Sequence, residues 1–233
     1  MRVITEKDLF KLSGISAAIA LALGIWVGYA KAPVAGDLRL AREIQAQARF
    51  SETAHFVNWL GDWQWVPFLA VGLIVLWKAG YRGFRGRGPR GPQEALYAFI
   101  AIGALRLVNN LLKAVFDSPR PLEELGIRVD RLRDTTGFPS GHVYGDVLFF
   151  GALAAFAPLW VPERLVLPVR MLLVAVILLA GPARVYVGAH WPSDALGGYL
   201  WGLAALSLGL AYGRWAARQG GGQHQAAAKR ARG

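Results

Sequence analysis

Cysteine is absent from this chain of 233 residues, and histidine occurs only four times. Without cysteine, neither a disulfide nor a thiolate metal site can contribute to the fold. The histidines are His55, His142, His190 and His224, and their spacing does not offer the clustered ligands of a structural zinc ion. The sequence therefore predicts neither a bound metal nor a cofactor.

Charged residues are also scarce, at 18% of the chain, whereas hydrophobic residues make up 55%. The mean hydropathy is positive, at +0.34, and the nine Trp and seven Tyr suit anchoring at a membrane interface. This composition predicts an integral membrane protein. Because a helical span needs about 20 residues, the chain has little room for a separate soluble domain.

Six apolar runs predict an all-α fold, an integral membrane bundle of six transmembrane helices. The expected spans lie near residues 12–30, 59–77, 94–115, 143–160, 167–183 and 195–213. Together they form one domain over residues 1–218. The first run could also be a secretory signal peptide, but Trp26 and Tyr29 are bulky where a cleavage site needs small residues, which favours a retained helix.

Three segments between or beyond these runs are polar. Residues 37–58 place Leu38, Ala41, Ile44 and Ala48 at helical spacing, which fits either an amphipathic helix on the membrane surface or a solvated helix. Residues 78–92 are rich in Arg, Gly and Pro and predict a flexible loop beside anionic headgroups, not a nucleic-acid site. Residues 219–233 are rich in Gly, Gln, Ala and basic residues and predict a disordered tail.

The informative motifs are three short segments in the second half of the chain. They read Lys113-Ala-Val-Phe-Asp-Ser-Pro-Arg120-Pro, then Pro139-Ser140-Gly141-His142, then Arg184 followed by His190 and Asp194. Each falls at an end of a predicted span. The first segment follows the third span, the second precedes the fourth span, and the third lies between the fifth and sixth spans. All three therefore lie on one face of the membrane and predict a single composite site.

These residue types suit chemistry on a phosphate group. Lys113, Arg120 and Arg184 can neutralise the two negative charges of a phosphomonoester or pyrophosphate. Ser140 and Gly141 precede an apolar run, so their amides are expected at a helix start, where anions are attracted. The Ser140 hydroxyl could contact phosphate or simply cap that helix.

Two imidazoles could then move protons near neutral pH, because the unperturbed pKa of histidine is about 6.5. Pro192 favours the first turn of a helix, which places Asp194 in that turn and His190 in the loop before it. The residues alone would allow His142 and His190 to exchange the roles of nucleophile and acid. The carboxylate at close spacing favours His190 as the nucleophile.

In order and spacing, the three motifs resemble the tripartite signature of the type 2 phosphatidic acid phosphatase superfamily, over roughly residues 95–213. The resemblance implies a metal-independent phosphatase in which His190 attacks phosphorus and forms a phosphohistidine. It implies that Asp194 orients His190 and that His142 protonates the leaving oxygen. It also implies that Lys113, Arg120, Ser140, Gly141 and Arg184 bind the phosphate.

One position departs from the family pattern, because Ala183 stands where serine is common before the arginine. A lost neutral hydrogen bond to phosphate costs roughly 1 kcal/mol, which should alter affinity without abolishing catalysis. Arg106 and Asp146 lie inside predicted spans, where they could face the site, pair with each other or make a structural contact. We do not assign them to the site.

Lysine and arginine concentrate near both termini and in residues 78–92, which predicts that these parts are cytoplasmic. The site would then face the periplasmic or extracellular side of the plasma (inner) membrane of a bacterium. The resemblance implies a lipid phosphate substrate from the outer leaflet: undecaprenyl pyrophosphate, phosphatidylglycerophosphate or phosphatidate. The sequence does not separate these three.

The sequence leaves two other functions open. A phosphotransferase could pass the phosphohistidine to another lipid with the same residues. A non-catalytic protein that binds or transports a lipid phosphate would be favoured if Ala183 marked a decayed site. The vanadate-dependent peroxidases have a similar anion pocket but are soluble, and the hydropathy of this chain argues against that class.

Overall fold

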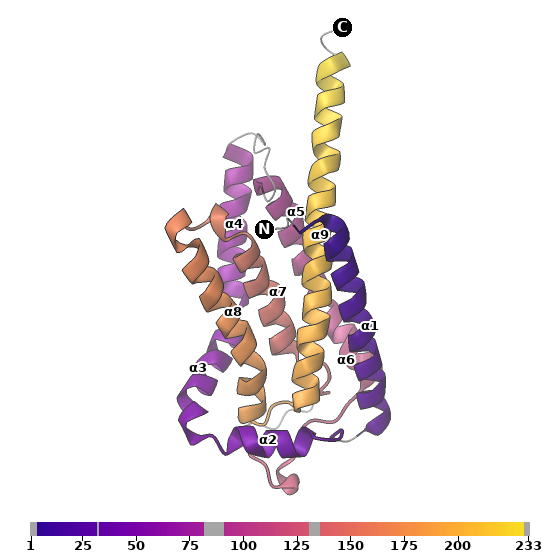
Figure 1. The fold of residues 1–233 in the computed structure, drawn as a ribbon, viewed down its shortest axis with the longest axis vertical. Helices are drawn as coiled ribbons and strands as arrows, with labels where there is room; N and C mark the ends of the chain where they lie inside the picture. Colours follow the sequence, from indigo (N-terminus) through magenta and orange to yellow (C-terminus); the bar gives the residue numbers. More distant parts are fainter. Residues whose placement is uncertain (1–3, 32, 82–90, 131–135, 231–233) are drawn as a thin grey trace.

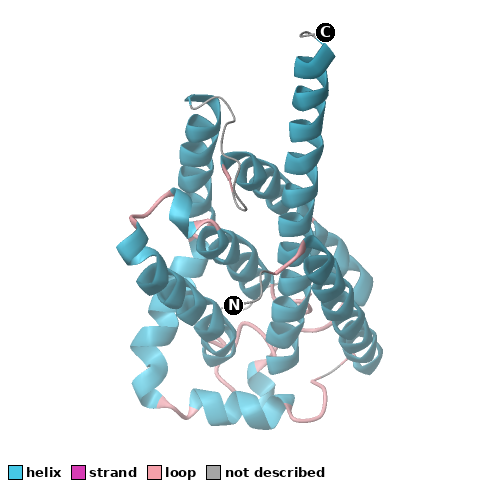
Figure 2. Cartoon of the chain, turned by 45° about the horizontal axis from the view of Figure 1, so that its top comes forward, coloured by secondary structure: helices cyan, strands magenta, loops and turns pink. Residues whose placement is uncertain are grey.

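The computed structural model describes residues 4–31, 33–81, 91–130 and 136–230, and the regular structure in these ranges is entirely helical (Figures 1 and 2). The α-helices are α1 (Glu6–Ala30), α2 (Asp37–Gln45), α3 (Ser51–Asp62), α4 (Trp65–Tyr81), α5 (Pro92–Leu105), α6 (Val108–Phe116), α7 (Gly141–Ala155), α8 (Glu163–Tyr186) and α9 (Pro192–Arg230). Three 3-10 helices are η1 (Ala48–Phe50), η2 (Glu123–Leu125) and η3 (Ala157–Leu159). The expectation of an all-α fold is confirmed.

Four helical segments in these ranges are long and apolar enough to cross a membrane. They are α1, the nearly continuous α5 and α6 (Pro92–Phe116), α8, and α9 as far as Gln219. A fifth span would be the pair formed by Ala48–Asp62 and Trp65–Lys78, which is bent by 47°. The molecule is therefore a multi-pass membrane protein with four or five candidate spans. Most of the span expected at residues 59–77 corresponds to Trp65–Lys78, the second helix of the bent pair.

Helix α7 lies where the fourth span was expected, at residues 143–160, and it is shorter than that expectation. It has 15 residues, which at 1.5 Å per residue give about 22 Å, less than the roughly 30 Å of a hydrocarbon core. Its side chains are largely buried, and α3, α4, α5, α8 and α9 all contact it. Figure 1 shows α7 inside the bundle. A helix enclosed by other helices need not match the bilayer thickness on its own.

Helix α9 packs along α1, α5 and α7, so it joins both halves of the bundle. Its approach to α7 is close, because a Cβ atom on Gly198 would lie 2.9 Å from Cβ of Val143, and one on Gly202 would lie 2.8 Å from Cβ of Val147. Small residues that let two backbones approach are a common way to hold membrane helices together. This contact positions the starts of α7 and α9 side by side.

The three sequence motifs lie at the end of the bundle that α2 crosses (Figure 1). The ends of α6 and α8 and the starts of α7 and α9 meet there. Both termini lie at the opposite end, where Arg214 of α9 donates a hydrogen bond of 2.6 Å to the Ile4 carbonyl oxygen. The expected agreement of all three motifs on one face is therefore present in the fold.

The polar segments differ from their expectations in detail. Within residues 37–58, Ala41 is buried and Leu38 and Ile44 pack against the end of the bundle, so the apolar face of α2 is covered by protein. Where a disordered tail was expected from residue 219, helix α9 continues to Arg230; the stretch Gln223–Lys229 is rich in Ala and Gln, which favour helix. Most of the basic loop expected at residues 78–92 lies outside the described residues.

Candidate active site

Backbone and side-chain hydrogen bonds join the three motifs into one site. The Gly137 N–H donates to the Ser118 carbonyl oxygen at 2.7 Å, and the Ser140 N–H donates to the Asp194 carbonyl oxygen at 2.9 Å. The Arg120 guanidinium donates to the Ala189 carbonyl oxygen at 2.5 Å. The segments before α7 and α9 are thus connected to each other and to the loop after α6.

His190 and Asp194 form a buried pair at the start of α9. Nδ1 of His190 lies 3.2 Å from Oδ2 of Asp194, and the exposed fractions of the two side chains are 2% and 0%. The Trp191 N–H donates to the same carboxylate oxygen at 3.1 Å, so the turn itself holds the carboxylate in place. Because a carboxylate accepts hydrogen bonds, we assign the ring proton of His190 to Nδ1, which leaves a lone pair on Nε2.

The free nitrogen of His190 faces a cluster of positive charge. Nη1 of Arg120 lies 3.2 Å from Nε2 of His190, and a guanidinium can only donate, in agreement with the assigned tautomer. Burial lowers the pKa of His190 well below its ordinary value of 6.5, and the charges of Arg120, Arg184 and Lys113 lower it further. His190 is therefore neutral at pH 7. Its Nε2 lone pair faces Arg120, which together with Lys113 and Arg184 is called here the cationic cluster.

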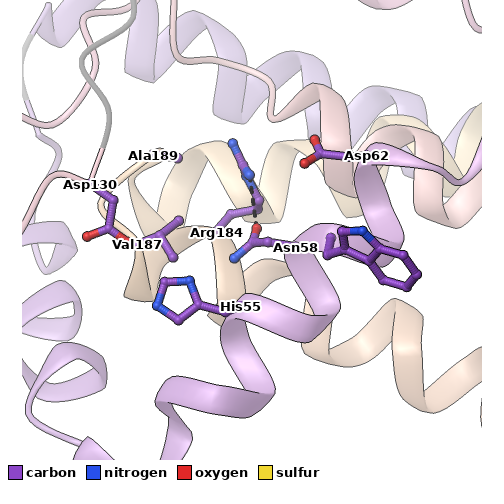
Figure 3. A pocket seen from close by; sticks show the side chains of 8 residues that line it. His55, Asn58, Asp62, Asp130, Arg184, Val187 and Ala189 are labelled. Atoms are coloured by element: carbon purple, nitrogen blue, oxygen red, sulfur yellow. Dashed lines mark hydrogen bonds between the residues drawn. The ribbon is translucent and has the colours of Figure 1, made fainter.

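The other two members of the cationic cluster are held by neighbouring polar groups. Nζ of Lys113 donates to the carbonyl oxygens of Thr136 at 2.6 Å and Gly137 at 3.2 Å. Nη1 of Arg184 donates to Oδ1 of Asn58 on α3 at 2.9 Å, and the Arg184 side chain is buried (Figure 3). Asn58 in turn donates to the Ala183 carbonyl oxygen at 3.0 Å. Both cations are thereby held close to His190.

The start of α7 supplies a second feature of an anion site. Ser140 is the N-cap residue and Gly141 the first helical residue, and the Ser140 N–H bond to the Asp194 carbonyl oxygen brings this helix start to the pair of His190 and Asp194. The Ser140 side chain is fully buried, yet it makes no capping hydrogen bond, and its hydroxyl has no hydrogen-bond partner among the described residues. A buried hydroxyl without a cap favours contact with a bound anion over the plain helix cap.

His142, on the first turn of α7, is paired with a carboxylate from another helix. Its Nε2 lies 2.7 Å from Oδ1 of Asp62, the last residue of α3. The His142 side chain is 19% exposed and that of Asp62 is 57% exposed. The two histidines of the site thus differ, because His190 is enclosed whereas His142 reaches solvent. A solvent-accessible imidazole is placed to exchange protons with a departing group and with water.

Two polar residues of the site, Asn58 and Asp62, were not predicted from the sequence. They precede the region of family resemblance, in a part of the chain interpreted as a membrane-surface or solvated helix and the start of a span. Their spacing of four residues places both on one face of α3, and an Asp just inside an apolar run is unusual in a membrane protein. The shared helix face and the unusual Asp could have identified Asn58 and Asp62 from the sequence.

A third residue outside the motifs supports the site from α2. The carboxylate of Asp37 accepts hydrogen bonds from the Ser193 N–H at 2.8 Å and from the Ser193 hydroxyl at 2.7 Å. These bonds satisfy an amide in the first turn of α9. Burial raises the pKa of Asp37 from its ordinary value, and the bonds from Ser193 oppose that rise. Helix α2 therefore holds the turn that carries His190 and Asp194.

The two charged residues left outside the site assignment border it. Arg106 lies over the ring of Tyr144 at 5.9 Å, and its Nη2 would lie 3.8 Å from a Cβ atom on Gly141. A Cβ atom on Gly61 would lie 3.0 Å from the His142 ring and 3.3 Å from Oδ2 of Asp146. Ala183 is fully buried in an apolar cluster with Ala54 and Val57. The described residues contain no group of three or more His, Asp or Glu side chains placed to hold a metal ion.

The fold and the site together define a class of protein: a helical membrane protein with an anion site at one end, built around a neutral buried histidine. Comparison with known proteins agrees with that class. The model of the PAP2 superfamily matches residues 94–218. This match covers more than half of the chain, and the chain belongs to this superfamily. The resemblance seen in the three motifs is confirmed.

Individual relatives are similar over most of the bundle. A "Lipid A 1-phosphatase" of Rhizobium etli is 28% identical over 181 residues, which are 72% of this chain and 68% of that protein. An Escherichia coli protein named "Putative undecaprenyl-diphosphatase YbjG" is 33% identical over 141 residues, 59% of this chain and 61% of that one. The crystal structure of a Bacillus subtilis PAP2-type phosphatidylglycerolphosphate phosphatase superposes with a TM-score of 0.60 at 23% identity, covering 82% of this chain and 92% of that one, so the fold is shared.

Proposed function

We propose that this protein is a metal-independent membrane phosphatase that hydrolyses a lipid phosphate or pyrophosphate through a phosphohistidine on His190. The observation that carries the proposal is the environment of His190: Nδ1 lies 3.2 Å from the Asp194 carboxylate and Nε2 lies 3.2 Å from the Arg120 guanidinium. A neutral imidazole whose free nitrogen faces a guanidinium of the cationic cluster is placed to attack an anionic phosphorus centre. Relatives named as phosphatases in the same superfamily support this class of hydrolase.

In the first step, Nε2 of His190 attacks phosphorus, and the bond to the leaving oxygen breaks. The Asp194 carboxylate stabilises the positive charge that develops on the ring through Nδ1–H. The cationic cluster, the Ser140 hydroxyl and the Gly141 amide stabilise the equatorial oxygens, as expected for phosphoryl transfer. His142 donates a proton to the leaving oxygen, which departs as an alcohol or a phosphate.

In the second step, water replaces the alcohol. His142, now neutral, takes a proton from that water, which attacks the phosphohistidine and releases inorganic phosphate. His190 returns to its neutral form with the proton still on Nδ1. The partial exposure of His142 supports this exchange with water, and the enclosure of His190 protects the intermediate from uncontrolled hydrolysis.

The proposed substrates are the lipids that the resemblance implies: undecaprenyl pyrophosphate, phosphatidylglycerophosphate and phosphatidate. We further propose that α7 and its flanking residues complete a sixth crossing, with both termini cytoplasmic in a bacterial inner membrane. The basic residues near the termini support that orientation. The site would then meet lipid headgroups of the outer leaflet.

Phosphate release in a chelator tests the proposed function. Detergent-purified protein should release inorganic phosphate from at least one of the three lipids, at the same rate with EDTA as with added magnesium. The rate is independent of metal because the cationic cluster supplies the charge that a metal would supply. Turnover that is lost in EDTA and restored by magnesium would contradict the proposal. Binding without turnover would indicate a lipid-binding protein, and lipid-to-lipid transfer exceeding phosphate release would indicate a phosphotransferase.

Asn58→Ala is expected to lower kcat/KM for lipid phosphate about tenfold, the equivalent of roughly 1.4 kcal/mol for a hydrogen bond to a charged group. The variant removes the acceptor that orients the Arg184 guanidinium, 2.9 Å away. Inhibition by vanadate, a phosphate mimic, should weaken in parallel, because phosphate and vanadate both bind the N–H donors of the Arg184 guanidinium. Unchanged inhibition would show that Asn58 does not position Arg184.

A further inference from the structure

Asp62, the last residue of α3, brings to the site a carboxylate that the mechanism above does not use. Its Oδ1 lies 2.7 Å from Nε2 of His142, the proposed acid. The two helices touch at this point, because a Cβ atom on Gly61 would lie 3.0 Å from Cδ2 of the His142 ring. Gly61 is buried, and Asp62 follows it directly. The packing of α3 against α7 therefore fixes the place of the carboxylate.

Helix α3 contacts two functional groups of the site from one face. Asn58 and Asp62 are four residues apart, and both line a pocket of about 310 Å³ that Arg184 also lines (Figure 3). Asn58 accepts a hydrogen bond from Arg184, and Asp62 contacts His142 one turn further along. Both residues precede the range 94–218 that the superfamily model matches. Helix α3 thus adds to the proposed acid a contact that the three motifs do not include.

Positive charge is prominent around His142 in the described part of the chain. His142 lies close enough to His190 for its charge to act there, as the charges of the cationic cluster do. The cationic cluster therefore also acts on His142. Like charges disfavour a protonated imidazole, and an acid must be protonated to act.

The structure provides an opposite charge in direct contact, the carboxylate of Asp62. The charged and titratable side chains around His142 and Asp62 come from every element that meets there: His55 of α3, Arg106 and Lys113 of the α5–α6 segment, Arg120 and Asp130 between α6 and α7, Asp146 of α7, Arg184 of α8, and His190 and Asp194 at the start of α9. A carboxylate within hydrogen-bond distance favours the protonated imidazole. Asp62 is thus placed to offset the cationic cluster.

We propose that Asp62 is a positioning residue for His142: its carboxylate fixes the ring and keeps it protonated for the first step. When water attacks in the second step, the same carboxylate favours the return of a proton to His142. The inference rests on the proposed phosphatase function, and Asp62 acts only through His142. The site then contains two pairs of histidine and aspartate with opposite tasks. His190, enclosed with Asp194, stays neutral and attacks, whereas His142, which is 19% exposed, carries the proton and donates it.

The pH dependence of kcat/KM tests this role in the full-length protein in detergent. Because His142 must carry a proton to act, kcat/KM for a lipid phosphate falls as the pH rises through the titration of His142. Asp62→Asn keeps the size of the side chain and removes its charge, so this fall is expected at a pH lower by about half a unit to one unit. Above the fall, kcat/KM is then about three- to tenfold lower than in wild type, and below it the two proteins are equal. The titration of the lipid itself is common to both proteins and cancels.

Three controls make the shift specific to the pair of Asp62 and His142. Hydrolysis of p-nitrophenyl phosphate needs no acid, because p-nitrophenolate departs without a proton, so its pH profile should be the same in wild type and Asp62→Asn. Glu52→Gln removes the same charge from the same helix, about 15 Å away at 1.5 Å per residue, and should not shift the lipid profile. Asp62→Glu keeps the charge, and its lipid profile should lie nearer to that of wild type than to that of Asp62→Asn.

A lipid profile that Asp62→Asn does not shift would overturn the inference while phosphate release continued. An equal loss at every pH with both substrates would also overturn it, since Asp62 would then support the fold or the phosphate site and not the acid. An equal shift in Glu52→Gln would assign the effect to net charge. Wild type that releases no phosphate from any lipid gives a different result, which contradicts the proposed function and the inference together. Asp62→Ala, which also lacks the charge, provides the same comparison if Asp62→Asn does not fold.

Discussion

His190→Ala should release no measurable phosphate from any lipid, a loss of at least about a thousandfold in kcat. The variant removes the only group that the mechanism uses to bond to phosphorus. The cationic cluster and the start of α7 would remain, so phosphate or vanadate should still bind. Loss of turnover with retained binding separates the nucleophile from the residues that only hold the anion.

Trapping of the intermediate makes this prediction specific to His190. Quenching of wild type with radiolabelled substrate in SDS at alkaline pH should leave a label on the protein that is stable in alkali and lost in acid, as expected for a phosphohistidine. His142→Ala should retain that label when the substrate has an activated leaving group such as p-nitrophenol, because such a group departs without a proton. The label should then persist, since the second step lacks its base.

Label on His190→Ala protein would contradict the assignment, and it would support the exchanged roles that the residues alone allow. His224→Ala is the matched control for loss of an imidazole, because His224 lies far along the chain from all three motifs. Phosphate release and labelling in His224→Ala should equal those of wild type. Gel filtration in detergent would show whether each variant remains folded.

The sequence predicted the local geometry of the three motifs better than it predicted the membrane crossings. The motifs carry their own local geometry: Pro192 opens α9, which places Asp194 in its first turn and His190 just before it. Ser140 ends the loop before α7 in the same way. Such features depend on neighbours in sequence, so a short pattern is enough to indicate them. The contacts of Arg120 with Ala189 and His190, in contrast, depend on how the helices pack.

Contacts between distant segments could not be predicted in this way. Arg184 and Asn58 are 126 residues apart and His142 and Asp62 are 80 apart, and no local pattern states that α3 lies against α7 and α8. The number of spans was also uncertain for a physical reason. Hydropathy measures how apolar a run is, not whether lipid or other helices surround it, and α7 is apolar because it is enclosed by protein.

Gly188→Ala should destabilise the protein and remove most of its activity. Gly188 lies in the turn between Arg184 and His190 with φ of +65°, where a side chain costs about 1 to 3 kcal/mol in strain. A Cβ atom there would also collide with the Arg128 carbonyl oxygen and lie 2.8 Å from Cα of Val129. Both are backbone atoms, which cannot rotate away as the end of a side chain can. The turn would have to move, and His190 would move with it.

Thermal unfolding in detergent, followed by tryptophan fluorescence, together with phosphate release, would test this prediction. Gly14→Ala is the matched control, because Gly14 lies within α1 and a Cβ atom there meets nothing within 4 Å. Alanine favours helix over glycine by up to about 1 kcal/mol, so this control should be as stable as wild type or slightly more stable. An equally stable and active Gly188→Ala protein would show that the turn can relax without displacing His190. Loss of activity that exceeds loss of stability is the expected result, because a shift of about 1 Å in a catalytic group costs far more in rate than in folding.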